Sequence, residues 1–252
     1  MSTFPDPWPD GVRAAVSLTF DDGTPDQLRD GVPRMTEREL FGTFYLPLRG
    51  DNYRERLAGW ETALAAGHEL GNHSLNHTCS ENFSNERHPR GLESMTLAEM
   101  EEDLLEAERR LVDLFGPVPA RSFAYPCYMT HVGRGLTRQT YVPLVAKHFI
   151  AGRGGGEVGF HNHPYHCDLA CVAGLTCQQM TGPEMIGLCE RAAAQGRWAV
   201  LCFHGLSVGR LGTSLGDFVE LLDHLAAHRD RFWTAPLATV AQRLTTARAP
   251  LG

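Results

Sequence analysis

The chain has no apolar run that approaches the ~20 residues a helix needs to span a bilayer. It also has no cluster of Lys and Arg, and its formal net charge is -7, so it lacks the basic stripe that nucleic-acid backbones require. Residues 1–11 contain neither the basic segment nor the apolar segment of a secretory leader. We therefore expect neither a membrane nor a nucleic acid as partner, and a cytoplasmic location.

Cysteine is present without the regular spacing of a disulfide-rich domain. The cysteines number seven, an odd count, and lie at Cys79, Cys127, Cys167, Cys171, Cys177, Cys189 and Cys202. This pattern favours free thiols in a reducing compartment over a disulfide framework. No histidine is placed in the sequence to activate Cys127 or Cys202, so we expect neither to act as a nucleophile.

Short apolar runs alternate with helix-like segments along the whole chain. The runs expected as buried strands are 14–20, 43–46, 69–72, 121–125, 147–151, 198–203 and 232–234. Thr96 and Glu99 form a capping box before a helix at 96–115, and Pro183 opens another that ends at Gln195. About seven βα units predict a single α/β domain, a distorted (β/α)7-type barrel. We place this domain at 12–252, after an N-terminal extension at 1–11.

Acidic residues and histidines follow several of these expected strands. Asp21 and Asp22 follow the first strand, His73 and His77 the third, and His204 the sixth. The C-terminal ends of barrel strands converge, so these side chains are expected to meet. One carboxylate and two imidazoles leave a coordination position for water, as in hydrolytic zinc sites. The pattern predicts a metal-dependent hydrolase, although an Asp-Asp-Gly turn or a histidine pair is by itself an ordinary surface feature.

Three of these segments resemble the motifs of carbohydrate esterase family 4, the polysaccharide deacetylases. They are Thr19-Phe20-Asp21-Asp22-Gly23, His73-Ser74-Leu75-Asn76-His77 and Leu201-Cys202-Phe203-His204. The resemblance spans roughly residues 12–244 and implies a distorted (β/α) barrel that removes acetyl groups from sugars.

The resemblance also implies a role for each residue of the site. It implies that Asp22, His73 and His77 bind the metal, that Asp21 is the catalytic base, and that His204 is the general acid. A carboxylate beside the ion can take a proton from water, and a protonated imidazole can pass one to the leaving group. Two imidazoles and a carboxylate favour Zn²⁺, although Co²⁺, Ni²⁺ or Fe²⁺ fit the same ligands.

The third and fourth motifs of the family are altered in this chain. The third reads Phe123-Ala124-Tyr125-Pro126-Cys127, with Ala124 where the family has an arginine. The resemblance implies that the backbone N–H of Cys127 is the oxyanion donor, because a main-chain donor survives a change of side chain. Arg153 follows the next expected strand, and we expect it to supply the missing guanidinium to Asp21.

A long loop rich in histidine and cysteine lies at 161–177. It could hold a second metal, but its spacing matches no common zinc pattern. We expect instead a lid over the site whose histidines meet substrate or solvent.

The expected activity is removal of an acetyl group from an N-acetylated sugar or a related acetamido compound, with metal-bound water as the nucleophile. Two alternatives within hydrolysis are an O-acetyl esterase of the xylan type and a small-molecule amide hydrolase. The alternative of another class is a catalytically silent barrel that binds carbohydrate or a protein. The expected partner is therefore an acetylated carbohydrate or a small acetamido substrate, and the sequence leaves the oligomeric state open.

Overall fold

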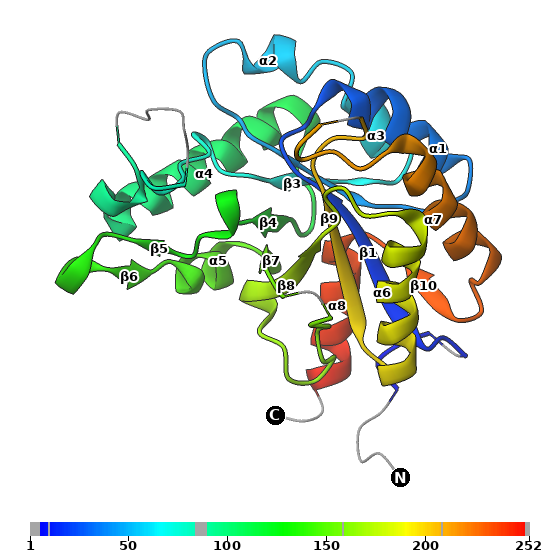
Figure 1. Ribbon diagram of the computed structural model, residues 1–252. Helices are drawn as coiled ribbons and strands as arrows, with labels where there is room; N and C mark the ends of the chain where they lie inside the picture. The colour runs from blue at the N-terminus through cyan, green and yellow to red at the C-terminus, as the bar shows by residue number, and fades with distance from the viewer. Residues whose placement is uncertain (1–5, 10, 84–89, 158, 208, 250–252) are drawn as a thin grey trace.

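The computed structural model describes residues 6–9, 11–83, 90–157, 159–207 and 209–249. Within them a parallel sheet closes on itself, with helices packed around it (Figure 1). In spatial order the ring consists of β1 (Ala14–Phe20), β2 (Thr43–Leu46), β3 (Glu69–Asn72), β4 (Ser122–Ala124), β7 (Ala151–Gly155), β8 (Val172–Thr176) and β9 (Trp198–Phe203). Because β9 pairs again with β1, the predicted (β/α)7-type barrel is confirmed.

Strand β1 carries the closure of the barrel. On one side it pairs with β9 over six positions, from Ala15 to Phe20. On its other side β10 (Phe232–Thr234) pairs with its first residues, and β2 pairs with Thr19 and Phe20 at its end. All seven residues of β1 are buried, as in a strand covered on both faces, and the hydroxyls of Ser17 and Thr19 donate to the carbonyls of Ala235 and Leu201.

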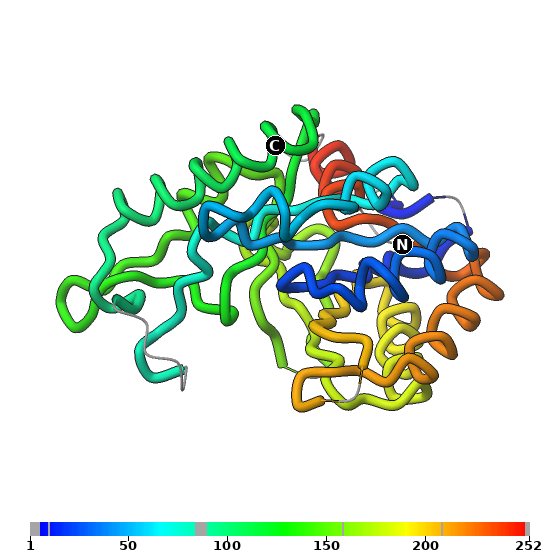
Figure 2. Tube along the Cα trace, turned by 90° about the horizontal axis from the view of Figure 1, so that it is seen from above, coloured from blue at the N-terminus to red at the C-terminus, as the bar shows by residue number. Residues whose placement is uncertain are grey.

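The helices cover the outside of the ring, as the view from above shows (Figure 2). They are α1 (Val32–Thr36), α2 (Tyr53–Arg56), α3 (Glu61–Ala65), α4 (Leu97–Phe115), α5 (Val142–His148), α6 (Gly182–Gln195), α7 (Leu215–Ala227) and α8 (Leu237–Arg248). The capping box predicted at Thr96 and Glu99 is present at the start of α4. Helix α6 has Pro183 in its first turn and ends at Gly196, which adopts the left-handed conformation.

Aromatic rings fix the strands that deliver the candidate site. Phe20 at the end of β1 stacks on Phe44 of β2 at 4.6 Å and on Phe203 of β9 at 5.1 Å between ring centroids. Phe218 of α7 meets Phe20 edge-on at 5.8 Å. Such ring pairs each contribute about 0.5–1.5 kcal/mol beyond their buried area. The residues that follow β1 and β9 are therefore held in register by a packed aromatic layer.

One strand prediction is wrong in part, and three short strands were not predicted. Lys147 and His148 belong to the last turn of α5, and the strand begins only at Ala151. Strand β8 lies inside the segment predicted as a loop. A short hairpin, β5 (His131–Val132) with β6 (Gln139–Thr140), was also not predicted. All of these segments are only two to five residues long, so periodicity carries little signal for them.

The prediction of a lid at 161–177 is also wrong. Asn162 forms a bridge with Trp198, the first residue of β9, and its side chain bonds the backbone of Ala173 near the start of β8. Arg248 of α8 donates to the carbonyls of Pro164 and Cys167. Residues 161–171 therefore lie at the N-terminal ends of the strands, opposite the candidate site, and β8 makes up most of the rest of the segment (Figure 1).

The predicted N-terminal extension contributes a buried residue. Trp8 is buried, packs with the cluster around Trp198 and Leu244, and donates from its indole N–H to the carbonyl of Gly196 at 3.3 Å. The guanidinium of Arg243 donates to the carbonyls of Pro7 and Trp8. The boundary between residues 11 and 12 stays a prediction.

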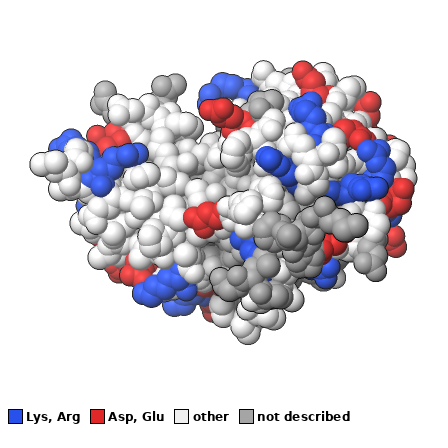
Figure 3. Space-filling view, turned by 90° about the horizontal axis from the view of Figure 1, so that it is seen from below, with Lys and Arg blue, Asp and Glu red and all other residues white. Residues whose placement is uncertain are grey.

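The surface carries charges of both signs. Figure 3 shows one face on which Lys and Arg alternate with Asp and Glu around the edge, and uncharged residues occupy much of the centre. Among the described residues, no helix has the length and apolar character needed to cross a membrane.

Replacing Thr96 with alanine should lower the free energy of unfolding by about 1 kcal/mol, because the N–H of Glu99 loses its acceptor. Thr246→Ala is the matched control, since that exposed hydroxyl bonds only within its own helix. Urea unfolding followed by circular dichroism measures both, and equal stability of the two variants would contradict the capping role.

Candidate active site

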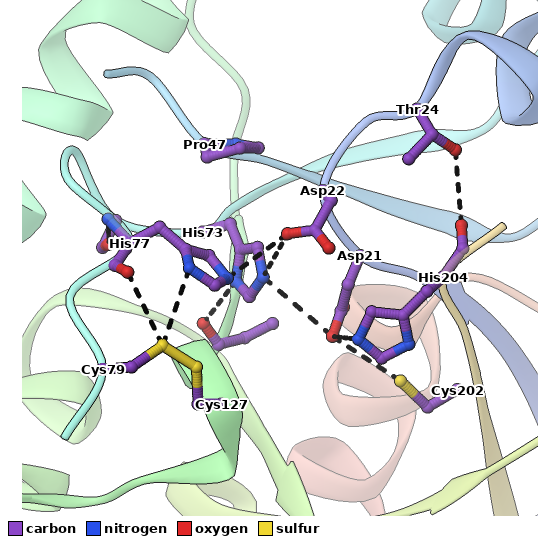
Figure 4. Close-up of polar contacts among 12 residues, drawn as sticks. Asp21, Asp22, Thr24, Pro47, His73, His77, Cys79, Cys127, Cys202 and His204 are labelled. Atoms are coloured by element: carbon purple, nitrogen blue, oxygen red, sulfur yellow. Dashed lines mark hydrogen bonds and ion pairs between the residues drawn. A yellow bond between two sulfur atoms is a disulfide. The ribbon is translucent and has the colours of Figure 1, made fainter. Parts of the chain in front are cut away.

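The residues predicted to form the site meet at the C-terminal end of the barrel (Figure 4). Asp21 and Asp22 follow β1, His73 and His77 follow β3, and His204 follows β9. The parallel pairing of these strands brings their ends to one rim, although the residues lie far apart in the chain.

Asp21 is a buried carboxylate enclosed by donors. It is 3% exposed, and its Oδ1 accepts a hydrogen bond from the guanidinium of Arg153. Its Oδ2 lies 4.0 Å from Nε2 of His73 and 3.8 Å from Nε2 of His204. Burial opposes ionisation of this carboxyl, but the charge of Arg153 and its hydrogen bond outweigh that effect and hold the pKa of Asp21 below its usual range. Asp21 is therefore ionised at neutral pH, as a proton acceptor must be.

Arg153 reaches Asp21 from the far side of the ring. It belongs to β7, is fully buried, and its guanidinium carbon lies 5.3 Å from the ring centroids of both Tyr45 and Tyr128. The contact expected from its place in the sequence is thus present, while its role in catalysis stays a prediction. Burial disfavours its charged form, yet Asp21 raises the pKa of Arg153 above its ordinary value.

Three side chains next to Asp21 form a set suited to a divalent metal. Nε2 of His77 lies 3.3 Å from Oδ1 of Asp22, and Nε2 of His73 lies 3.8 Å from the same oxygen. One ligand atom from each of the three residues lies within 4.8 Å of the other two. Nδ1 of His73 is 2.9 Å from the carbonyl of Ala124, so Nδ1 carries the proton and Nε2 presents its lone pair.

A buried atom without a partner supports the metal assignment. Nε2 of His73 is buried and makes no hydrogen bond within the described part of the chain. A buried nitrogen left in this way is costly unless a ligand satisfies it. An ion between His73, His77 and Asp22 would do so, and the three residues therefore fit a divalent metal.

A second group of ligand atoms, from Asp21, Cys202 and His204, is a weaker metal site. Asp21 already forms an ion pair with Arg153, so a cation bound there would be repelled by the positive guanidinium. Burial raises the pKa of the Cys202 thiol to about 12, so the thiol remains protonated. It lies 3.6 Å from Oδ2 of Asp21 and 3.3 Å from the hydroxyl of Tyr128, contacts that orient the carboxylate.

The loop that carries the two histidines is braced by a residue that the sequence analysis missed. The carboxylate of Asp103 on α4 accepts from the N–H of Leu75 at 2.7 Å and from the side chain of Asn76 at 2.7 Å. Ser74 and His77 both adopt positive φ, at 63° and 54°, which a loop tolerates only when its contacts fix it. The available signal was an acidic residue on the apolar face of α4, between Met100 and Leu104.

His204 lies on the other side of Asp21. The amide of Gln27 donates to its backbone carbonyl, and the hydroxyl of Thr24 lies 3.4 Å from that oxygen. Its ring meets that of Tyr128 edge-on, with centroids 6.4 Å apart. The loop after β1 thus fixes the backbone of His204 while its ring faces Asp21.

The expectation of uniformly free thiols is wrong at one pair. Cys79 and Cys127 form a disulfide, with their Cα atoms 5.8 Å apart. It joins the loop after β3 to the loop after β4 and lies beside His77 (Figure 4). The pair is separated by 48 residues, and sequence spacing carries no signal for their meeting. Cys127 has a φ of 52°, and its predicted role as the oxyanion donor stays a prediction.

The fold and the site together define a (β/α) barrel of the hydrolase type, with a three-ligand set and an ionised carboxylate at the strand ends. Residues 10–130 match the family model described as polysaccharide deacetylase. The resemblance seen in the sequence is thereby confirmed for this region, which contains Asp21, Asp22, His73 and His77. The family comprises deacetylases and esterases. No curated protein sequence matches the chain.

Solved structures share the fold over nearly the whole chain. A Mycobacterium smegmatis protein assigned as a polysaccharide deacetylase is 18% identical, with a TM-score of 0.66 over 98% of this chain and 96% of that chain. The allantoinase Puue is 13% identical, with a TM-score of 0.69 over 97% and 95%. A family 4 acetyl xylan esterase from Clostridium thermocellum, solved with a cobalt ion, is 15% identical, with a TM-score of 0.54 over 90% of each chain.

Replacing Asp22 with asparagine, or His73 with alanine, should reduce bound zinc from about one ion per chain to near zero, because each change removes a ligand. Asp21→Asn should keep the ion, since Asp21 pairs with Arg153 instead. Elemental analysis of dialysed protein measures both, and metal loss in Asp21→Asn with retention in Asp22→Asn would reverse the assignment.

Replacing Arg153 with glutamine should raise the pKa of Asp21, because burial then acts without an opposing guanidinium. The acid limb of kcat/KM for release of acetate should move to higher pH by about 1–3 units. Arg121→Gln is the matched control, since this buried arginine bonds Glu108 away from the site and its loss should affect stability alone. An unmoved acid limb in Arg153→Gln would exclude this role.

Proposed function

We propose that the chain is a metal-dependent hydrolase that removes an acetyl group from an N-acetylated sugar or a related acetamido compound. The observation that carries the proposal is the placement of Asp21. This ionised carboxylate lies between the three-ligand set and His204, with 4.0 Å to His73 on one side and 3.8 Å to His204 on the other. A proton acceptor and a proton donor thus flank one position at the rim of the barrel.

The side chains would divide the reaction between them. Asp21 would accept a proton from the attacking water, because it is ionised and its Oδ2 faces the position between the histidines. His204 would donate a proton to the leaving amine from Nε2, the nitrogen that faces Asp21. The backbone N–H of Cys127 would stabilise negative charge on the acyl oxygen.

Asp22, His73 and His77 would hold the divalent ion. When bound, such an ion supplies Lewis acidity, which lowers the pKa of water and polarises an acyl oxygen. Zinc suits one carboxylate and two imidazoles, and cobalt, nickel and iron are the alternatives. The cobalt ion in the acetyl xylan esterase shows that one structure with this fold was solved with such a metal.

The effect of removing His204 should differ between an amide substrate and an ester substrate. An amine leaves an acyl centre less readily than an alcohol does, so an amide substrate needs its general acid more. His204→Ala should therefore reduce kcat on an N-acetyl substrate by about 10²–10⁴-fold and on an O-acetyl substrate by clearly less. Equal losses on both would show that His204 is not the acid for the leaving group.

The decisive experiment measures acetate released by zinc-loaded protein, with metal-stripped protein and Asp21→Asn as controls. The substrates are N-acetylated sugars, peptidoglycan fragments, O-acetylated xylan and allantoin, the last assayed by ring opening. Zinc-dependent release that is lost in Asp21→Asn supports the proposal, and substrate preference distinguishes deacetylase from esterase or amide hydrolase. Retention of zinc with no hydrolysis of any substrate would favour a silent binding protein.

A further inference from the structure

His77 faces two groups of ligand atoms with its two ring nitrogens. Nε2 lies 3.3 Å from Oδ1 of Asp22, inside the candidate catalytic set. Nδ1 lies 3.8 Å from Sγ of Cys79, which forms the disulfide with Cys127 (Figure 4). The ring therefore stands between a set of oxygen and nitrogen ligands and a pair of sulfur atoms.

Nδ1 of His77 lies at 3.8 Å from Sγ of Cys79, a separation that two ligands of one metal ion can have, and the two sulfurs need only move apart once their bond is broken. One ligand atom each from His77, Cys79 and Cys127 lies within 4.8 Å of the other two. In a tetrahedral zinc site, bonds of about 2.3 Å to sulfur and about 2.0–2.1 Å to nitrogen place neighbouring ligand atoms at comparable separations. In the disulfide the sulfurs are bonded to each other and offer no thiolate, so oxidation keeps this site closed.

The surrounding loops hold the two cysteines in place independently of the disulfide. The N–H of Ser80, next to Cys79, donates to Sδ of Met129, which lies two residues beyond Cys127. The N–H of His77 donates to the hydroxyl of Ser74 at 2.9 Å. The N–H of Tyr128 bonds the carbonyl of Tyr125 across the turn that contains Cys127. Opening the disulfide would therefore leave both thiols beside Nδ1.

We propose that reduction of the Cys79–Cys127 disulfide creates a second metal site, formed by both thiolates and Nδ1 of His77, for a thiophilic ion such as Zn²⁺ or Cd²⁺. Thiolate ligands select these soft ions, whereas the neighbouring set of one carboxylate and two imidazoles discriminates less among metals. The second site shares His77 with the candidate catalytic set. The number of metal ions bound at the C-terminal end of the barrel would therefore depend on whether the Cys79–Cys127 disulfide is reduced. The inference rests on the positions of these three residues and does not require the proposed acetyl hydrolysis.

The chemistry of opening and filling the site is balanced. A water-soluble trialkylphosphine gives two electrons to the disulfide and takes an oxygen atom from water, becoming the phosphine oxide. The two hydrogens of that water are added to the two sulfurs, which become two thiols. Binding of the ion then releases both thiol protons, because the thiolate is the ligand. When Nε2 of His77 already holds the ion of the catalytic set, binding through Nδ1 releases the ring proton of His77 as well, and the imidazolate bridges the two ions.

The test titrates metal-free protein with Cd²⁺ alone, before and after reduction with the phosphine, and follows the ultraviolet absorbance of cadmium–thiolate bonds. Oxidised protein should bind about one ion without this absorbance, whereas reduced protein should bind about two and show it. A thiol count on denatured protein should rise from five to seven, since seven cysteines include the bonded pair.

Cys79→Ser should lose both the second ion and the thiolate absorbance after reduction. Cys171→Ser, which removes a half-buried free thiol elsewhere, is the matched control and should retain both. Asp22→Asn should lose the ion of the catalytic set and keep the thiolate absorbance, so failure at one site is distinguished from failure at the other. Absence of thiolate absorbance in reduced wild-type protein, or its survival in both Cys79→Ser and Cys127→Ser, would overturn the inference.

Discussion

The buried pair of Asp21 and Arg153 is the interaction on which the site depends. A carboxylate that is 3% exposed would carry a penalty of several kcal/mol if it stood alone. Arg153 comes from β7, which lies across the ring from β1, so the pair spans the interior of the barrel. The guanidinium is fully buried and also lies over the rings of Tyr45 and Tyr128, within the range of cation–π contacts. Any change that moves β1 away from β7 would therefore separate Asp21 from Arg153 and leave both charges buried without a partner.

The same pair explains how two adjacent aspartates serve different purposes. Asp21 ends an extended strand and points inward, whereas Asp22 has a φ of 74° and remains about one-third exposed. The left-handed conformation turns the second carboxylate toward His73 and His77 and away from Arg153. A cation is thereby offered a carboxylate that no guanidinium has already neutralised.

Much of the candidate site could be predicted, because each of its residues follows a strand that the sequence indicates or lies at the end of one. The ends of parallel strands converge, so residues that follow apolar runs meet, and Arg153 was found against Asp21 for this reason. The Cys79–Cys127 bond and the bracing by Asp103 could not be predicted, because both depend on the packing of loops against elements distant in the chain. Strand β8 was missed for another reason, since Val172–Thr176 lies inside the segment whose histidines and cysteines were taken to indicate a loop.

The double pairing of β1 has a consequence for how the chain is made. This strand is synthesised well before its partners β9 and β10, which lie more than 170 residues later in the chain. Until Trp198–Phe203 has been synthesised, one full edge of an apolar strand has no partner. Unpaired edges of this kind are where growing chains associate wrongly. The barrel thus gains its closure, and the meeting of Asp21 with His204, only after β9 has been synthesised.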